Sequence, residues 1–217
     1  MKAVIFDFNG VIINDTSYHI KAWELIAKKY SLERFTEDYK RRIYGKSTET
    51  IARELFKQKP TEDEIARYAR EKELMYMKLL GKDLPIAEGL SDFIGDLEKH
   101  AIKIAMATSS AREFAEKILR QAKLMEKFLA IVTVDDVRHP KPDPEIYLKA
   151  AQAIGENPLD CVAIEDTLLG IRSAKGSGMR AIGFVDTYSD KKLKEAGANF
   201  VISSFRNLTV ENVTARL

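Results

Sequence analysis

Four polar clusters in this chain contain the residue types that phosphoryl transfer to a carboxylate requires. In chain order they are Asp7 with Asn9, Thr108 with Ser109, Lys141, and Glu165 with Asp166. An aspartate can act as a nucleophile toward phosphorus, and hydroxyls and a lysine can bind the oxygens of the transferring phosphate. An acidic pair near that aspartate would repel it unless a cation is bound, and hard oxygen ligands beside a phosphate favour Mg²⁺. The clusters therefore predict a magnesium-dependent phosphoryl-transfer site.

Each cluster alone also has an ordinary structural interpretation. An aspartate that ends a strand is commonly a turn residue, and hydroxyls such as Thr108 and Ser109 commonly cap a helix. Carboxylates ahead of a helix stabilise its dipole without any metal, and a lysine between prolines is often an exposed loop residue. Their order and their shared position after predicted strands favour one common site over four unrelated features.

Six short apolar runs rich in Val, Ile and Ala predict the strands that would position these clusters. The runs are 3–8, 102–108, 130–134, 161–164, 180–184 and 200–202. Helical patterns lie between them: residues 90–100, a helix that Ser110 would cap and that runs to about Ala122, one opened by Pro144 and one capped by Thr167. Buried strands that alternate with helices indicate an α/β fold with a doubly wound parallel sheet. Ligands of such sheets bind beyond the carboxyl ends of the strands.

The segment from about residue 15 to residue 80 interrupts this alternation. It contains amphipathic helical patterns, at 17–30 and from Thr61 onward, and no convincing strand. Gly81 and Pro85 then mark the return to the sheet. We therefore predict an α/β core of residues 1–15 and 81–217 and an inserted helical cap of residues 16–80, which can close over the strand ends.

The composition describes a globular protein and bounds its partners. The 217 residues are 45% hydrophobic and 31% charged, which suits a folded chain with a sizeable core. A formal net charge of +2 provides no strong field for nucleic acid or an anionic membrane. No apolar run reaches membrane-spanning length, no signal-like segment opens the chain, and Cys161 is the single cysteine. We expect a cytoplasmic protein with a small phosphorylated metabolite as partner and neither nucleic acid nor membrane; the oligomeric state stays open.

Taken together, the motifs resemble those of the haloacid dehalogenase superfamily. The matching residues are Asp7-Phe8-Asn9-Gly10-Val11, Thr108, Lys141-Pro142 and Glu165-Asp166-Thr167. The helical insertion after the first motif is similar to the cap of the β-phosphoglucomutase and phosphoglycolate phosphatase subfamily. The resemblance covers the whole chain and implies a Rossmann-like core beneath a helical cap.

In the core, the resemblance implies a role for each matched residue. Asp7 would be the nucleophile and a metal ligand, and Asn9 would supply its backbone carbonyl to the metal. Lys141, the third predicted catalytic residue beside Asp7 and Asn9, would bind the transferring phosphate. The other implied phosphate-binding residues are Thr108 and Ser109. Asp166 would complete the Mg²⁺ site, and Glu165 would be an acidic neighbour that ligates the ion through water.

Asn9 departs from the family pattern, because the usual residue is the aspartate that acts as general acid and base. An amide can still offer its carbonyl and bond a substrate oxygen, but it cannot transfer the proton. Loss of general acid/base catalysis typically costs about 10²–10⁴-fold in rate. We therefore predict an attenuated phosphatase. Asn9 is either a natural variant or a substitution that traps the enzyme, and the sequence leaves both open.

The cap supplies further candidates and a second departure. Thr48 stands where we align the arginine with which β-phosphoglucomutase holds a second phosphate, and this favours a phosphatase over a mutase. Lys46 is either a substrate-binding residue or a solvated loop lysine, and Lys72 has the same two interpretations. His19, also a candidate substrate-binding residue, either replaces the missing acid with Asp15 nearby or bonds the hinge backbone.

Three other functions remain as alternatives. A sugar-phosphate mutase would use the same core residues, and a bisphosphate activator would accelerate it. A metal-free dehalogenase would also use an aspartate nucleophile, but the presence of Asp166 and of the Gly10-Val11 turn disfavours it. A binding protein that has lost turnover would keep every binding residue, so the sequence does not separate it from a slow enzyme.

Overall fold

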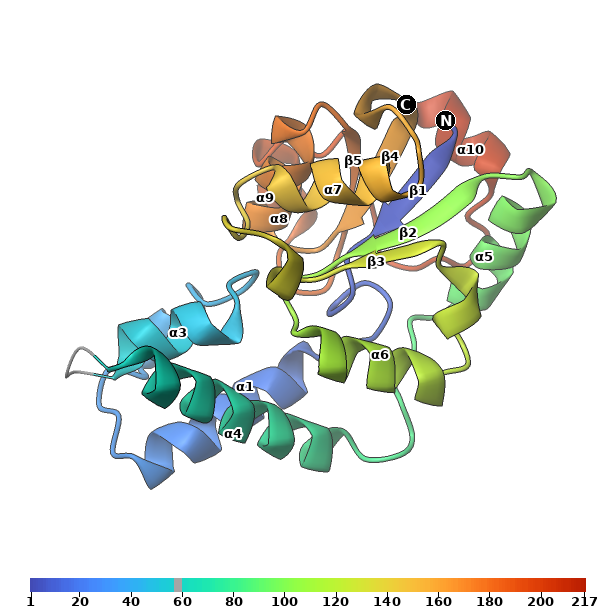
Figure 1. The fold of residues 1–217 in the computed structure, drawn as a ribbon. Coiled ribbons are helices and arrows are strands. Elements are labelled where there is room, and N and C mark those ends of the chain that lie inside the picture. Colours follow the sequence, from blue (N-terminus) through green and yellow to red (C-terminus); the bar gives the residue numbers. More distant parts are fainter. Residues whose placement is uncertain (57–59) are drawn as a thin grey trace.

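A six-stranded parallel sheet forms the centre of the molecule (Figure 1). The computed structural model describes residues 1–56 and 60–217 of the chain. The strands are β1 Ala3–Phe6, β2 Lys103–Ala107, β3 Ala130–Val132, β4 Cys161–Glu165, β5 Arg180–Phe184 and β6 Phe200–Ile202. Their order in the sheet is β3-β2-β1-β4-β5-β6. The direction of winding reverses between β1 and β4, so the crevice beyond these two strands is the expected ligand site.

Helices cover both faces of the sheet, which confirms the predicted doubly wound α/β fold. One face carries α5 Leu90–Lys99, α6 Arg112–Gln121 and α10 Val210–Arg216, and the other carries α7 Glu145–Ala153, α8 Leu168–Gly176 and α9 Asp190–Glu195. Short 3₁₀ turns lie at Met125–Lys127, Val134–Asp136 and Pro158–Asp160. Alternate residues of a strand point to opposite faces, so β1 is apolar throughout and contributes to both cores.

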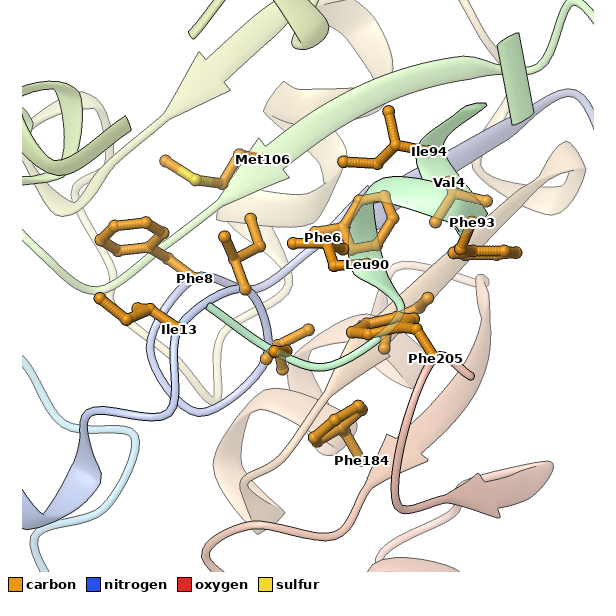
Figure 2. Close-up of a cluster of buried hydrophobic side chains, with 14 of the residues drawn as sticks. Val4, Phe6, Phe8, Ile13, Leu90, Phe93, Ile94, Met106, Phe184 and Phe205 are labelled. Carbon is orange, nitrogen blue, oxygen red and sulfur yellow. The ribbon is translucent and has the colours of Figure 1, made fainter. Parts of the chain in front are cut away.

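The core on the α5 face is built around aromatic side chains (Figure 2). Phe6 of β1 lies edge-on to Phe93 of α5, with ring centroids 6.2 Å apart, and Phe205 packs against both rings. Val4 shares this cluster, whereas Ala3 and Ile5 belong to the cluster beneath α7 and α8. This packing holds β1 rigidly, so the backbone that follows Phe6 leaves the sheet at a defined point.

Within its described residues the cap contains four helices, which lie apart from the sheet layer (Figure 1). They are α1 Thr16–Lys29, α2 Glu37–Lys40, α3 Thr48–Leu55 and α4 Glu62–Leu80. Thr61 and Glu64 form a reciprocal capping box that starts α4, as Thr61 predicted, and Gly81 follows its end with φ of 69°. The cap has its own apolar core, which includes Trp23, Ile26 and Ile65.

Several predicted bounds differ from the structure: the second and third strands are shorter than the predicted runs 102–108 and 130–134, and the larger differences lie at the first strand and at Ser110. The first strand ends at Phe6 rather than residue 8, because Asp7 to Gly10 turn away into a loop. Ser110 does not cap α6; Ala111 occupies that position with no side-chain cap, and the Ser110 hydroxyl bonds Asn9 instead. None of the helices among residues 1–56 and 60–217 combines the length and apolar character needed to cross a membrane.

Candidate active site

Lys141 lies at the centre of the strand-end cluster. It is 5% exposed, and its ammonium Nζ donates to Asp7 Oδ1 at 2.8 Å, Glu165 Oε1 at 2.6 Å and the Ala107 carbonyl at 3.1 Å. Burial alone would lower the pKa of Lys141, but the charges of Asp7 and Glu165 raise it above its ordinary value. The lysine is therefore a fixed positive charge between two strand-end carboxylates.

Glu165 orients that lysine and is itself fully bonded by the protein. Its Oε1 also accepts from the Tyr147 hydroxyl at 3.1 Å, and its Oε2 accepts from both the amide and the hydroxyl of Thr167 at 3.0 Å. The first turn of α8 approaches the carboxylate so closely that a Cβ at Gly170 would overlap it. Glu165 therefore has little freedom to turn toward another ligand.

Asp166 differs, because one of its oxygens is unused. Its Oδ2 accepts from the Thr187 hydroxyl at 2.5 Å, whereas Oδ1 is buried and has no hydrogen-bond partner among the described residues. Burial, together with the charges of Glu165 and Asp7, raises the pKa of Asp166 well above its ordinary value. An unpaired carboxylate oxygen buried among other carboxylates is costly unless a cation completes it.

The three carboxylates offer a donor set that suits a hard divalent cation. Ligand atoms of Asp7, Glu165 and Asp166 lie within 4.8 Å of one another. Burial and the nearby charge of Glu165 raise the pKa of Asp7 to about 7, even though Lys141 acts in the opposite direction. Oxygen-only donors with mutual repulsion match the preference of Mg²⁺ or Ca²⁺. Asp166 Oδ1 and Asp7 are the best placed, since both oxygens of Glu165 are already bonded.

The side chain of Asn9 is held by three neighbours, none of which the sequence identified as its partner. Its Oδ1 accepts from the Ser110 hydroxyl at 2.6 Å, and its Nδ2 donates to Asp15 Oδ2 at 2.6 Å. The same Nδ2 lies 3.0 Å from His19 Nε2. Asp15 is fully buried and also accepts from the Tyr76 hydroxyl and, at 3.3 Å, from the Gly10 amide. The amide at position 9 is thus matched to a carboxylate at position 15.

Asp15 is held as an anion in this setting. Burial acts to raise its pKa, but the charge and hydrogen bond of His19, with the hydrogen bonds from Tyr76 and Asn9, lower it below its ordinary value. His19 Nε2 lies 3.3 Å from Asp15 Oδ2, its Nδ1 lies 2.5 Å from Lys72 Nζ, and its ring stacks on Tyr76. The His19 ring therefore contacts side chains of the site and of the cap. One of the two hypotheses from the sequence instead predicted a bond to the hinge backbone.

A cavity of about 100 Å³ lies between the core and the cap. The core residues that line it include Asp7, Asn9, Thr108, Ser109, Lys141, Glu165 and Asp166. The cap contributes His19, Ile20, Trp23, Ile43, Tyr44, Lys46, Thr48, Ile51 and Lys72. All the site residues expected from the sequence thus face one space. The cavity is large enough for a phosphate-sized group and several waters.

Lys46 and Lys72, the two cap lysines that could have been solvated side chains, are both bonded to glutamates. Lys72 is 1% exposed, so the solvated interpretation is wrong for it, and its Nζ also donates to Glu73 Oε1 at 3.0 Å. Lys46 pairs with both oxygens of Glu54, at 2.7 and 2.8 Å. The helical pattern of the cap carried no signal for these pairs, because Lys72 sits on a helix dense in charges.

The hydroxyl residues after β2 connect the core with the cap. Thr108 is 1% exposed, and its Oγ1 accepts from the Ser110 amide at 3.0 Å. The Ser109 hydroxyl donates to the Gly45 carbonyl of the cap at 3.2 Å. Gly45 has φ of 81° and approaches Thr167 so closely that a Cβ would crowd it. These contacts place the cap loop directly over the strand ends.

The family model for haloacid dehalogenase-like hydrolases matches residues 4–184, a range that includes Asp7, Asn9, Thr108, Ser109, Lys141, Glu165 and Asp166. The chain belongs to this family. The haloacid dehalogenase-like family expected from the sequence is thereby confirmed, and the relatives that follow confirm the resemblance to the β-phosphoglucomutase group with its helical cap.

Relatives within the haloacid dehalogenase-like hydrolases are similar over nearly the whole chain. β-Phosphoglucomutase of Bacillus subtilis is 34% identical over 97% of this chain and 93% of its own length. Phosphorylated carbohydrates phosphatase of Thermotoga maritima is 33% identical over 91% of this chain and 92% of its own. The crystal structure of β-phosphoglucomutase from Clostridium difficile superposes with a TM-score of 0.87 at 28% identity, over 100% of this chain and 96% of that one.

Gly10 allows the first motif to approach Asp166, and this gives a testable expectation. It has φ of 75°, and a Cβ there would lie 2.6 Å from Asp166 Cγ. Gly10→Ala should displace that carboxylate and weaken Mg²⁺ affinity by about 10- to 100-fold. Isothermal titration with Mg²⁺ measures this directly.

Gly155→Ala is the matched control for this experiment. Gly155 also has positive φ, 68°, but nothing lies within 4 Å of its added Cβ. Both variants should therefore lower the free energy of unfolding by a similar amount, about 1–2 kcal/mol, because a residue with a Cβ is strained in the left-handed conformation. Only Gly10→Ala should also change the affinity for Mg²⁺. Equal affinities in the two variants would mean that the approach of Gly10 to Asp166 does not matter for metal binding.

Proposed function

We propose that this protein is a Mg²⁺-dependent phosphomonoester hydrolase that acts on a small phosphorylated carbohydrate through an aspartyl-phosphate at Asp7. One observation carries the proposal. Asp7 faces the cavity with one oxygen bonded to Lys141, next to a carboxylate of Asp166 that has an unused buried oxygen. This arrangement provides a nucleophile, a fixed positive charge and a partly completed cation site within one enclosed space.

In this proposal each residue has a defined task. The Asp7 carboxylate attacks phosphorus and the substrate oxygen leaves, after which water attacks the aspartyl-phosphate and releases phosphate. Lys141 and the Thr108 hydroxyl bind the phosphate oxygens as charge moves onto them, and the Ser109 hydroxyl joins them by exchanging its hydrogen bond with the Gly45 carbonyl for one to the phosphate. Asp7, Asp166 and the backbone carbonyl of Asn9 would hold Mg²⁺, which supplies positive charge beside those oxygens. Glu165 orients Lys141, and because both of its oxygens are bonded by the protein it would contribute to the cation site only through a bridging water.

Asn9 limits the rate in the same scheme. Its amide holds Asp15 and Ser110 but provides no proton for the leaving oxygen and accepts none from the attacking water. The resulting loss is about 10²–10⁴-fold for a step that depends on general acid/base catalysis. For substrates with good leaving groups, the rate of the first step should fall least, because their leaving oxygen needs no acid to protonate it.

Hydrolysis is favoured over the mutase alternative by the cap. One relative is named as a mutase and another as a phosphatase of phosphorylated carbohydrates, so the family resemblance alone does not choose. The Thr48 hydroxyl donates to Glu73 and provides no positive charge that could retain a bisphosphate intermediate. A bisphosphate activator that accelerated interconversion of sugar phosphates would favour the mutase instead.

The first test is hydrolysis of p-nitrophenyl phosphate with Mg²⁺. We expect measurable turnover that EDTA abolishes and that added Mg²⁺ restores, since the charge of the three carboxylates must be offset before a phosphate dianion can enter. Asp166→Asn should raise the Mg²⁺ concentration needed for half-maximal rate. Turnover that survives chelation would contradict the metal-dependent scheme. Tight binding of sugar phosphates with no hydrolysis would favour a binding protein.

A further inference from the structure

Among the described residues, each basic side chain that the cap presents to the cavity has its own acidic partner. Lys46 is bonded to Glu54, Lys72 to Glu73, and His19 lies against Asp15. Among the described residues that line the cavity there is no arginine. The cap wall is thus close to neutral overall, whereas the core wall carries Lys141 together with the carboxylates of Asp7, Glu165 and Asp166, where the cation and the reacting phosphate are proposed to bind.

Glu73 is the residue that neutralises the centre of the cap wall. It is 5% exposed, and its Oε1 accepts from both Lys72 Nζ at 3.0 Å and the Thr48 hydroxyl at 2.5 Å. Burial acts to raise its pKa, but the charges of Lys72 and His19 and the hydrogen bonds from Thr48 and Lys72 together hold that pKa below its ordinary value. Glu73 itself lies behind Lys72 and Thr48, because those two line the cavity and Glu73 does not.

The hydrogen bonds to Glu73 also decide what Lys72 and Thr48 can still bind. Thr48 spends its only hydrogen on Glu73, so its oxygen can only accept from a ligand. Lys72 has three hydrogens: one goes to Glu73, and a second goes to His19 Nδ1 when that nitrogen carries no proton, so at least one donor remains. Both atoms bond the same carboxylate oxygen, and therefore they lie close enough to bind one hydroxyl or two adjacent hydroxyls.

We propose that Glu73 is a specificity-determining residue, because its charge makes the cap wall suited to bind an uncharged, hydroxylated group. The substrate is then a monophosphate of a sugar or polyol with no second anion. A hydroxyl both donates and accepts, which matches the remaining acceptor of Thr48 and the remaining donor of Lys72. A second phosphate or a carboxylate accepts only, and it would meet the Glu73 charge and a Thr48 oxygen that has no hydrogen left to donate. The inference rests on the proposed function, because the core wall is taken to hold the reacting phosphate.

The rest of the cap wall agrees with a neutral ligand. Ile20, Trp23, Ile43 and Ile51 line the same cavity, so the polar pair of Lys72 and Thr48 is bordered by apolar surface. Sugar rings present C–H faces between their hydroxyls, and such faces pack on apolar and aromatic side chains. A doubly anionic ligand would have to desolvate its second charge against this surface without a free cation.

The test compares the binding of mono- and bisphosphates by isothermal titration with Mg²⁺ present. The probes are glucose 6-phosphate against glucose 1,6-bisphosphate, and fructose 6-phosphate against fructose 1,6-bisphosphate, all in an Asp7→Asn background that prevents turnover. Glu73→Gln removes the charge while it keeps the shape and an acceptor oxygen. The ratio of the two dissociation constants does not depend on how much of a variant is folded, so a loss of stability leaves it readable.

We expect the parent to bind each bisphosphate no more tightly than the monophosphate, and Glu73→Gln to shift the ratio by about tenfold or more toward the bisphosphate. Glu71→Gln is the matched control, because Glu71 lies on the same helix but pairs with Lys29 and Tyr30 outside the cavity. It should leave the ratio unchanged.

Three results would overturn the inference. They are a parent that binds bisphosphates at least about tenfold more tightly, a ratio in Glu73→Gln equal to that in Glu71→Gln, and no binding of any probe. Failure of the proposed function is distinguishable, since it is read from p-nitrophenyl phosphate hydrolysis by the protein with Asp7 intact. A preference for monophosphates can therefore stand even if that hydrolysis is absent.

Discussion

Replacement of Asp7 by asparagine should lower phosphatase turnover by at least about 10⁴-fold, the scale on which loss of a covalent nucleophile acts in enzymes. The amide cannot form the aspartyl-phosphate. It can still accept from Lys141, whose Nζ lies 2.8 Å from Asp7 Oδ1, so the fold and the position of the lysine should persist. Hydrolysis of p-nitrophenyl phosphate measures the loss, and mass spectrometry of rapidly quenched parent protein should find one phosphoryl group on the Asp7 peptide.

Asp136→Asn provides the matched control for Asp7. Asp136 also follows a strand, β3, and it accepts from Thr133 and Arg112 outside the cavity. Its replacement should leave turnover within about twofold, which is the scatter of substitutions away from a site. Retention of more than about a tenth of the parent rate in Asp7→Asn would mean that another group is the nucleophile.

Asn9→Asp alone should raise turnover far less than the exchange of both residues in Asn9→Asp/Asp15→Asn. Asn9 Nδ2 lies 2.6 Å from Asp15 Oδ2, and Asp15 is fully buried. A carboxylate at position 9 would face a second carboxylate across that distance, and two such groups share a proton and hold each other in place. The exchange keeps one amide and one carboxylate in contact but moves the carboxylate to position 9, which lines the cavity with Asp7 whereas Asp15 does not.

We expect the exchange to raise the rate on alkyl phosphates by about 10²–10⁴-fold, the usual contribution of general acid/base catalysis. The four forms of a double-mutant cycle, each checked by mass, give the coupling between positions 9 and 15. Asp15→Asn alone serves as the control for loss of the buried carboxylate and should not raise the rate. If Asn9→Asp alone gives the whole increase, Asp15 does not oppose a carboxylate at position 9. If the exchange gives no increase, the missing acid is not what limits turnover.

Much of the core site could be predicted because β-strand ends are encoded locally. A continuous apolar run followed by a polar residue marks the point where a buried strand leaves a parallel sheet, and all such points lie at one edge. Asp7 after β1 and Glu165 and Asp166 at the end of β4 are therefore placed together by the sheet itself. Lys141 follows from the same reasoning once its motif is recognised.

Contacts between segments distant in the sequence were not predictable in the same way. Ser110 looks like a helix cap beside Thr108, yet its hydroxyl reaches Asn9 across the strand ends. Thr187 follows β5 and bonds Asp166, although nothing in its neighbourhood distinguishes it from an ordinary loop threonine. A side chain with several equivalent local partners is assigned to one of them only by the packing of other elements.

The sequence by itself determined the α/β core, the position of the helical insertion and the residues at the strand ends, because hydrophobic periodicity and strand order are properties of the chain. Only the tertiary structure decided the partners of the buried polar groups: Asp15 for Asn9, Glu73 for Lys72, and Thr187 for Asp166. The physical reason is that a buried charge must be paired within about 3 Å. Which partner lies that close depends on how the surrounding elements and loops pack, and the local sequence pattern carries no record of it.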